Sequence, residues 1–297
     1  MTTLDSLLTN LISALPTVAR EHVPGSSLYA LLRQVARAEV EKLFSGTGEE
    51  PHVFGPFGPI VFPYFNMGAV DSLDLFGLDE LIIFSFYWAN RHRYKHVVDA
   101  GANIGLHSLV MSCCGFQVTA FEPDPKHFEL LSRNMALNHC SSVEIRNAAV
   151  SSTDGELEFI RVVGNTTGSH LAGSKANPYG ELQRFPVPVH AIGPFLKRAD
   201  LLKMDVEGHE KQIVLSTCRE DWMNTDAMME VQCPENAAAL YEHFSKLKIS
   251  MFSQKSGWQK VRALRDLPTS HREGSLFVTC GAEMPWQSGY GGEAGRQ

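Results

Sequence analysis

The sequence predicts an α/β fold, a mostly parallel sheet of seven strands flanked by helices, with an N-terminal helical extension. Short apolar runs typical of strands alternate with amphipathic helical runs through most of the chain. This alternation is typical of Rossmann-like sheets, because each parallel strand needs a helical crossover before the next one. The strands are expected at residues 96–100, 117–121, 143–146, 201–206, 227–231, 249–253 and 275–279.

One helix and one interruption of this alternation bear on function. A helix is expected at 104–114, and Gly115 is well placed to end it. Two strand-like runs, 156–162 and 185–189, add an extra strand pair to the alternating pattern. The polar stretch 164–179 joins them and is a loop candidate that could cover a binding site.

The chain is expected to have three parts. Residues 1–90 read as an extension of helices and a short hairpin, because apolar residues recur there at helical spacing and are followed by Gly-Pro turns. Residues 91–282 form the α/β domain. Residues 283–297 are rich in glycine and polar residues, which predicts a flexible tail.

Composition limits the partners and the compartment. The 297 residues include 26 Lys and Arg against 33 Asp and Glu, a net charge of −7 that argues against nucleic acid as a partner. The six cysteines show neither a CxxC nor a Cys/His spacing typical of zinc. No signal-like start and no membrane-spanning apolar run is evident, so we expect a cytoplasmic protein without membrane contact.

The first motif, V-V-D-A-G-A-N-I-G at 97–105, is a strand that runs into a glycine turn and a helix. Glycines let the backbone approach a ligand, and the helix start exposes N–H donors. Glu122 ends the next strand, 21 positions after Gly101. An acid at that place in doubly wound folds accepts hydrogen bonds from ribose hydroxyls, so the two features together indicate a nucleoside-containing ligand.

The same motif favours S-adenosylmethionine (SAM) over a dinucleotide. In G-x-G-x-x-G the second glycine makes room for a pyrophosphate, and here Asn103 stands in its place. Asp99 precedes the turn, where a carboxylate would repel a diphosphate but would suit the ammonium group of an amino-acid ligand. SAM has a ribose, an ammonium and no phosphate, and therefore fits better than NAD.

A further motif, L-L-K-M-D-V-E-G-H-E at 201–210, ends a strand with carboxylates at Asp205 and Glu207. Their spacing of two places both on one side of the strand. A carboxylate there can hold a hydroxyl, accept its proton or bind a metal, although no metal ligand set is evident. Glu207 could instead cap the next helix. His209 could either reach the crevice or pack against other side chains. Glu230 could either face a bound acceptor molecule or be an internal hydrogen-bonded acid.

Five motifs in order resemble the FkbM family of SAM-dependent methyltransferases, over about residues 95–280. The resemblance implies O-methylation of hydroxyls on sugars, polyketides and other small or glycan acceptors, with SAM as cofactor. The motifs are D-A-G-A-N-I-G, F-E-P-D-P, the spacing of Asn134 and Asn138, N-A-A-V at 147–150, and K-M-D-V-E-G-H-E.

The resemblance also implies roles for individual residues. The glycine motif would hold the methionine end of SAM, Glu122 the ribose, and the N-A-A-V motif the adenine. Asp205 and Glu207 match the acidic motif beside the methyl group. The expected cofactor contacts are Asp99, Gly101, Ala102, Asn103, Gly105, Glu122, Pro123, Asn147, Ala148 and Asp205.

These observations predict a SAM-dependent methyltransferase acting on a hydroxyl of a small molecule, sugar or glycan. The catalytic candidates are Asp205, which would position or deprotonate the acceptor, and Glu207 or His209, which would assist. The alternatives are a catalytically silent SAM-binding module and an NAD-dependent oxidoreductase, whose common Tyr-x-x-x-Lys arrangement is absent. The N-terminal helices could pack on the core or on a second subunit in a homodimer.

Overall fold

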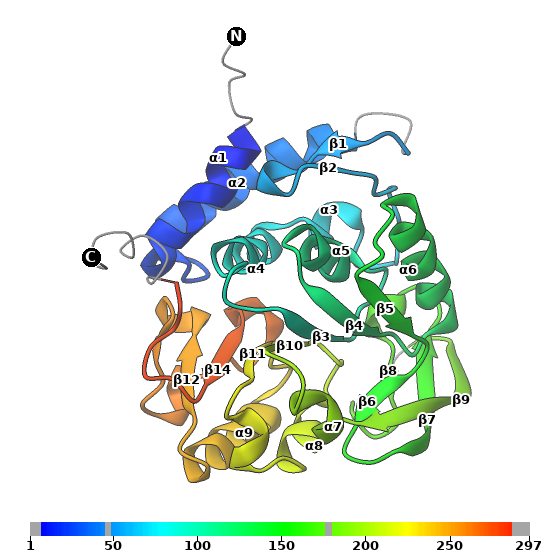
Figure 1. The fold of residues 1–297 in the computed structure, drawn as a ribbon, viewed down its shortest axis with the longest axis vertical. Helices are drawn as coiled ribbons and strands as arrows, with labels where there is room; N and C mark the ends of the chain where they lie inside the picture. Colours follow the sequence, from blue (N-terminus) through cyan, green and yellow to red (C-terminus); the bar gives the residue numbers. More distant parts are fainter. Residues whose placement is uncertain (1–6, 45–48, 176–179, 287–297) are drawn as a thin grey trace.

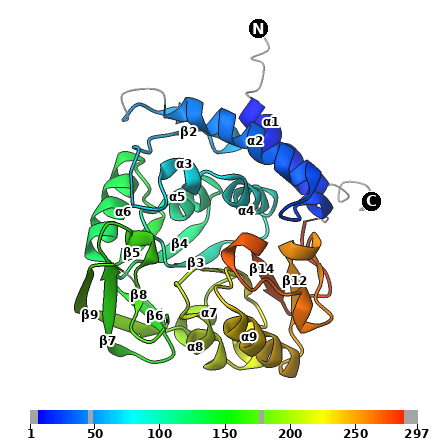
Figure 2. The same ribbon diagram turned by 180° about the vertical axis from the view of Figure 1, so that it is seen from behind.

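The computed structural model describes residues 7–44, 49–175 and 180–286. Within them, a large sheet lies between two layers of helices, and a smaller sheet stands beside it (Figure 1). The N-terminal helices form a further layer on the outer side of one helical layer (Figures 1 and 2). The predicted α/β fold is confirmed.

The large sheet contains all seven predicted strands and one more. Among the described residues its eight strands follow the order β13-β12-β14-β11-β10-β3-β4-β5, in which β3, β4, β5, β10 and β11 are parallel and β14 is antiparallel to its neighbours. The strands are β3 His96–Ala100, β4 Gln117–Phe121, β5 Val143–Arg146, β10 Leu201–Met204, β11 Asp226–Met229, β12 Ser250–Ser253, β13 Gln259–Lys260 and β14 Leu276–Thr279.

Helices cover both faces of the large sheet, as a buried parallel sheet requires. One face is covered by α4 Leu78–Ala89, α5 Leu106–Cys113 and α6 Pro125–Leu137, and the other by α7 Gly193–Leu196, α8 Glu210–Leu215 and α9 Pro234–Lys246 (Figures 1 and 2). Short 3-10 helices are η1 Leu15–Glu21, η2 Gly55–Phe57, η3 Thr166–Gly168, η4 Arg219–Trp222, η5 Gln254–Ser256, η6 Leu264–Asp266 and η7 His271–Glu273.

The predicted extra strand pair forms a second sheet with two further strands. Its order is β6-β9-β7-β8, and β7 pairs antiparallel with β9 from Gly155↔Val189 to Val162↔Leu182. The strands are β6 Ala149–Ser151, β7 Gly155–Val162, β8 His170–Leu171 and β9 Leu182–Ala191. Both predicted strands are longer than expected, and residues 176–179 of the predicted loop lie outside the described residues.

The N-terminal extension packs on the α/β core. The helices α1 and α2 contact α4, and Leu8, Ile12 and Leu15 share one apolar cluster with the sheet residue Val97. Ser26 caps α2 by accepting a hydrogen bond from the backbone of the first turn. The elements of the N-terminal extension are α1 Leu7–Ala14, α2 Ser27–Leu43, β1 His52–Val53, β2 Pro59–Ile60 and α3 Ser72–Leu75.

The start of the predicted tail is packed rather than loose. Met284 and Trp286 are both buried. The Trp286 ring meets His22 and Phe86 edge-on, with centroids 5.4 Å apart in each case. Residues 287–297 of that tail lie outside the described residues.

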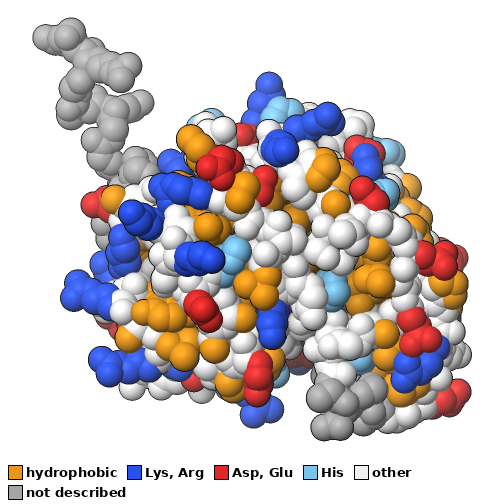
Figure 3. All heavy atoms as spheres, turned by 90° about the horizontal axis from the view of Figure 1, so that it is seen from below, with side chains coloured by type: hydrophobic (Ala, Val, Ile, Leu, Met, Phe, Trp, Pro, Cys, Tyr) orange, Lys and Arg blue, Asp and Glu red, His pale blue; other side chains and the backbone are white. Residues whose placement is uncertain are grey.

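The surface is mixed in character. Basic, acidic and apolar side chains are interspersed over the described part of the face drawn in Figure 3. In the described parts of the chain, no helix combines the length and the apolar character needed to cross a bilayer.

His22 joins the extension to the C-terminal part of the sheet. Its side chain is fully buried, Nε2 lies 3.0 Å from the carbonyl oxygen of Leu15, and Nδ1 accepts a hydrogen bond from Trp258 Nε1 at 3.0 Å. Burial lowers the pKa of His22 to about 4. The ring is therefore neutral in the folded protein, and protonation has to occur mainly in the unfolded chain.

Stability should consequently fall in acid through His22. The pKa of His22 is lower in the folded protein than its value near 6.5 in the unfolded chain. The stabilising contribution of the neutral ring is therefore complete above pH 6.5 and is lost as pH falls towards 4. This loss lowers the free energy of unfolding by about 3 kcal/mol. Urea unfolding at pH 7.5 and 4.5 would measure it, with His22→Gln as the comparison. The wild type should lose more stability than the variant over this range, and equal losses would remove His22 as the source.

Candidate functional site

Strand register brings the predicted motifs to one edge of the large sheet. Met204 of β10 pairs with Ala100 of β3, which pairs with Phe121 of β4. The next residues along these strands, Asp205, Gly101 and Glu122, therefore leave the sheet side by side. Ligands of open α/β sheets bind at such carboxyl ends.

A pocket lies at this edge and encloses about 610 Å³, including the open space at its mouth. Its size is within the range of small-molecule sites. We call it the main pocket. One wall comes from the large sheet and the loops after it, and the opposite wall comes from the second sheet and the segment before β8. The lining residues are Gly101, Asn103, Glu122, Pro123, His127, Ala149, Val150, Phe159, Thr166, Thr167, Ser169, His170, Leu171, Asp205, Val206 and Glu207.

The glycine turn fixes the floor of the main pocket. Gly101 has a φ of +79°, and a Cβ there would overlap the carbonyl oxygen of Asp205. The N–H groups of Gly101 and Ala102 both donate to the carbonyl of Phe121, at 3.0 and 2.9 Å. Only glycine fits at this position, because the backbone segments at the ends of three neighbouring strands are in direct contact there.

Glu122 is held by the backbone on both carboxylate oxygens. The N–H of Asn103 donates to Oε2 and the N–H of Asp124 to Oε1, each at 2.8 Å. Burial raises the pKa of Glu122 to about 8, and the two N–H bonds act in the opposite direction. Each oxygen keeps a further lone pair, so the ionised group can accept hydrogen bonds from ligand hydroxyls in the pocket.

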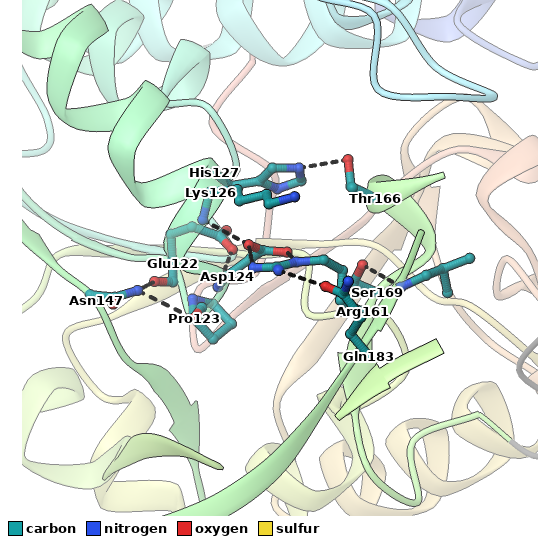
Figure 4. A network of polar contacts seen from close by, with 11 residues as sticks. Glu122, Pro123, Asp124, Lys126, His127, Asn147, Arg161, Thr166, Ser169 and Gln183 are labelled. Atoms are coloured by element: carbon teal, nitrogen blue, oxygen red, sulfur yellow. Dashed lines mark hydrogen bonds and ion pairs between the residues drawn. The ribbon is translucent and has the colours of Figure 1, made fainter. Parts of the chain in front are cut away.

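The second sheet is tied to this loop by a buried ion pair (Figure 4). Arg161 of β7 contacts both carboxylate oxygens of Asp124, with Nε 2.7 Å from Oδ2. Asp124 also caps α6 by accepting from the N–H of Lys126 at 2.8 Å. A second link joins His127 Nε2 to Thr166 Oγ1 at 2.8 Å. The two walls of the main pocket are thereby fixed to each other.

Breaking this ion pair should destabilise the protein strongly. The side chains of Arg161 and Asp124 are 9% and 1% exposed, so Arg161→Met leaves a buried carboxylate unpaired, at a cost of about 3–5 kcal/mol. Arg184→Met is the matched control. Arg184 and its partner Glu158 are both about half exposed, and such a pair contributes less than about 1 kcal/mol. Urea unfolding measures both, and equal effects of the two variants would contradict the expectation.

The acidic end of the main pocket holds one paired and one unpaired carboxylate. Among the described residues, Oδ1 of Asp205 is buried without a hydrogen-bond partner. Glu207 is paired with Lys175, whose Nζ lies 2.6 Å from Oε2. Burial and the charge of Asp205 raise the pKa of Glu207 to about 7. Glu207 also has a φ of 56°, a conformation that non-glycine residues adopt at some cost and that is enriched at functional sites.

A second, smaller cavity meets the main pocket at Asp205, which lines both. Glu80 of α4 and His107 of α5 form part of its wall, and His107 contacts Glu80 Oε2 at 2.8 Å and the Tyr87 hydroxyl at 3.0 Å. Glu230 lines it too, beside Asp205. The lining residues are Glu80, Ile83, His107, Lys203, Met204, Asp205, Met228, Met229, Glu230 and Ser275.

Residues 99–240, slightly less than half of the chain, match the family described as the methyltransferase FkbM domain. The resemblance drawn from the five sequence motifs is thus confirmed.

Two curated fungal proteins are similar to part of the chain. Methyltransferase sdnD of Sordaria araneosa is 33% identical over 167 residues, 45% of this chain and 64% of that protein. Methyltransferase 1 of Beauveria bassiana (strain ARSEF 2860) is 32% identical over 161 residues, 46% of this chain and 64% of that protein. The matches thus span slightly less than two thirds of each relative.

Among solved structures, the chain is similar to the SAM-dependent methyltransferase from Agrobacterium tumefaciens. The sequence identity is 10% and the TM-score 0.38, over 79% of this chain and 71% of that one.

Asp99 is enclosed by protein side chains. Its side chain is fully buried, accepts a hydrogen bond from Ser108 Oγ at 2.6 Å, and lies 3.4 Å from Lys203 Nζ. It lines neither cavity. Its Oδ1 has no hydrogen-bond partner among the described residues, and contact with a ligand ammonium stays a prediction.

Two further residues of the glycine motif serve packing instead of ligand contact. Ala102 is buried in the core and lies outside both cavity linings. Gly105 has a φ of +90°, and a Cβ there would overlap the side chain of Leu131 on α6. Gly105 therefore permits the close approach of α5 and α6, and neither residue is placed against a ligand as predicted.

The predicted base-binding residues are shifted along the chain. Asn147 is turned to the backbone, and its Nδ2 donates to the carbonyls of Glu122 and Pro123 at 2.9 and 3.2 Å (Figure 4). Ala148 is buried in the core below the sheet. Ala149 and Val150 line the main pocket in their place.

His209 links two elements beside the main pocket. Its Nε2 lies 3.0 Å from Ser151 Oγ and its Nδ1 3.1 Å from Ser174 Oγ. Burial lowers the pKa of His209, and the residue lines neither cavity. With both ring nitrogens engaged, His209 joins β6 to the segment after β8, and a role as catalytic assistant stays a prediction.

The remaining predicted residues are brought together in the main pocket, namely Gly101, Asn103, Glu122, Pro123, Asp205 and Glu207. The wall from the second sheet was not predicted residue by residue. Its only signal was the polar stretch 164–179, which was expected to cover a site. The missed residues of this wall are Phe159, Thr166, Thr167, Ser169, His170 and Leu171, with His127 beside them.

Proposed function

We propose that this protein is a SAM-dependent methyltransferase that methylates a hydroxyl of a small molecule, sugar or glycan. One observation carries the choice of cofactor. Among the described residues that line the main pocket, the buried polar atoms without a partner are Asn103 Oδ1, His170 Nε2 and Asp205 Oδ1. All three are placed as hydrogen-bond acceptors. A ligand rich in donors would satisfy them, and SAM carries an amino group, two ribose hydroxyls and an ammonium.

Charge supports the same cofactor. Glu122, Asp205 and Glu207 line the main pocket, and its described lining contains no Lys or Arg. Lys175 is engaged with Glu207, and Lys203 is engaged with Asp99 and the carbonyl oxygen of Gly101. A diphosphate would meet carboxylates without compensation, whereas the sulfonium and ammonium groups of SAM are attracted to them. The pocket therefore fits SAM and disfavours NAD.

The order of strands suggests how the parts of SAM would lie. Along the sheet edge, Asp205 follows β10, Gly101 follows β3, and Glu122 follows β4, while Ala149 and Val150 come from the chain after β5. The sulfonium end would lie beside Asp205 and Gly101. The ribose would be held by Glu122, and the base would rest on Ala149 and Val150.

Asp205 is the residue placed to act on the acceptor. When bound, SAM supplies a methyl group on a positively charged sulfur, which an acceptor oxygen can displace in line. Asp205 borders both cavities, so a hydroxyl that enters from the second cavity would reach its unpartnered oxygen. The carboxylate would take the hydroxyl proton as the oxygen forms its new bond to the methyl carbon.

The second cavity offers further groups to an acceptor. Burial, with the charges of Asp205 and Glu207, raises the pKa of Glu230 well above its usual range. A protonated Glu230 can donate a hydrogen bond to the acceptor or to Asp205. Ile83, Met228 and Met229 add apolar surface to the same cavity. This mixture of carboxyl groups and apolar side chains suits a hydroxyl on a partly apolar skeleton.

An acceptor screen with SAM labelled in the methyl group tests the proposal. The full chain would be incubated with sets of sugars, glycans, polyketide-like alcohols and, for comparison, amines. Label is expected in a hydroxyl-bearing set. Label in amines alone would overturn O-methylation, SAM binding without any transfer would indicate the silent module, and tight NADH binding without binding of S-adenosylhomocysteine would overturn the cofactor.

A further inference from the structure

His170 presents a free nitrogen to the main pocket. The residue belongs to β8, is 1% exposed and lines the pocket opposite the sheet edge. Its Nδ1 lies 3.0 Å from the carbonyl oxygen of Gly168. Because a carbonyl only accepts, Nδ1 carries the proton and Nε2 bears the lone pair. Nε2 is buried and has no hydrogen-bond partner within the described ranges of the chain.

A buried acceptor without a partner points to a ligand. Leaving such a group unsatisfied costs about 1–3 kcal/mol, so native proteins normally pair it. Burial lowers the pKa of His170, and the charges of Lys175 and Arg184 act in the same direction. The ring is therefore neutral near pH 7 and keeps its lone pair. The missing partner must be a hydrogen-bond donor.

The surroundings of His170 identify the kind of donor. In the second sheet Ile160 pairs with His170 and Phe159 with Leu171, which places β8 beside β7. Phe159 and Leu171 line the same pocket and are buried and apolar. They share a small apolar cluster with Ala149, which also lines the pocket. A flat aromatic base fits between such surfaces, and an amino group on its edge would be the donor.

We propose that His170 accepts a hydrogen bond from the 6-amino group of the cofactor's adenine and thereby selects adenine over 6-oxo purines. The inference rests on the proposed use of SAM. A 6-oxo group has only lone pairs to offer, so it would face the lone pair of Nε2 and leave both acceptors unsatisfied. Sites that hydrogen-bond a ligand group discriminate strongly against analogues without it, for this reason. His170 is thus a specificity-determining residue in a wall that carries no catalytic motif.

Calorimetry with two ligands that differ in the hydrogen-bonding edge of the base tests the inference. The ligands are S-adenosylhomocysteine and S-inosylhomocysteine, in which oxygen replaces the 6-amino group and N1 carries a proton, and the protein is the full chain. The wild type should bind the adenosyl compound about 30-fold more tightly. In His170→Phe, which keeps a ring but lacks the acceptor, the preference should fall below about fivefold, mainly through weaker binding of the adenosyl compound.

His127→Phe is the matched control. His127 is also a buried histidine of the main pocket, but its Nε2 is already paired with Thr166. This variant should weaken both ligands by a similar factor and leave the preference as in the wild type. Thermal melting of each variant checks that it is folded. The wild-type comparison needs no variant, and it tests the inference even if a substitution prevents folding.

The outcomes separate this inference from the proposed function. If the wild type binds both ligands within threefold of each other, or if His170→Phe keeps the full preference, His170 does not select the base, and SAM use stands. If the wild type binds neither ligand, the proposed cofactor is wrong and the selection falls with it. A preference of the expected size that His127→Phe keeps and His170→Phe loses supports the assignment.

Discussion

Replacing Asp205 by Asn is expected to lower the turnover number for methyl transfer by about 10³-fold, while the affinity for S-adenosylhomocysteine changes by less than about threefold. Asparagine keeps the shape of the side chain but cannot take up a proton. The unpartnered Oδ1 of Asp205 lies where both cavities meet. Loss of the carboxylate should therefore affect the reaction of the acceptor much more than the binding of the cofactor. Turnover is measured with an acceptor from the labelling screen, and affinity by calorimetry.

Asp154→Asn is the control for this substitution. The Asp154 side chain is 74% exposed and lies outside both cavity linings, so turnover should stay within twofold of the wild type. Unchanged turnover in Asp205→Asn would remove Asp205 from the mechanism. A parallel loss of affinity and turnover would instead make Asp205 a cofactor-binding residue only.

Replacing Glu122 by Gln is expected to weaken S-adenosylhomocysteine binding about 100-fold. Two hydroxyl donors to an ionised acceptor contribute about 1.5–3 kcal/mol each. Each carboxylate oxygen of Glu122 already accepts one backbone N–H, from Asn103 or from Asp124. Glutamine also replaces one of these oxygens by an NH₂ group, which cannot accept that hydrogen bond. Calorimetry measures the affinity. Glu129→Gln, on the exposed side of α6, should bind like the wild type.

The same carboxylate should make binding depend on pH. Burial raises the pKa of Glu122 to about 8 in the free protein, and the ionised form is the one that accepts from hydroxyls. Affinity should therefore rise from pH 6.5 to 8.5, by about tenfold. Glu122→Gln should show no such rise, and Glu129→Gln should keep it. A wild-type affinity that is flat over this range would exclude Glu122 as the titrating group.

The fold follows closely from sequence patterns because its strands are buried on both faces. All four residues of β10 are buried and all but Lys203 are apolar, which is close to the signal expected of a central parallel strand. The same reasoning fails for β13. Its two residues, Gln259 and Lys260, are exposed and polar, so no apolar pattern marks the eighth strand.

The candidate site could be predicted where its residues follow strand ends. Glu122 and Asp205 were found this way, because position on a strand decides which edge a residue reaches. The surroundings of Asp99 could not be predicted, because its neighbour Lys203 lies far along the chain and is brought alongside by strand pairing. A charge can be read from sequence, but its partner depends on tertiary structure.

The wall that holds His170 could not be predicted for a related reason. The segment around it is polar and without periodicity, and it reaches the main pocket only because β8 pairs with β7. The link between Arg161 and Asp124 likewise joins two motifs that look independent in the sequence. Local patterns mark the elements, while these long-range contacts decide which of them form the pocket.

The main-chain contact between Gly101 and Asp205 has a consequence for how such enzymes can diversify. Because no side chain fits between these two segments, the turn that would grip the cofactor and the strand end that would act on the acceptor have to be inherited as one rigid block. Natural variation or laboratory evolution of substrate range would therefore occur in α4 and the second sheet. These elements supply other walls of the two cavities and lie outside that block.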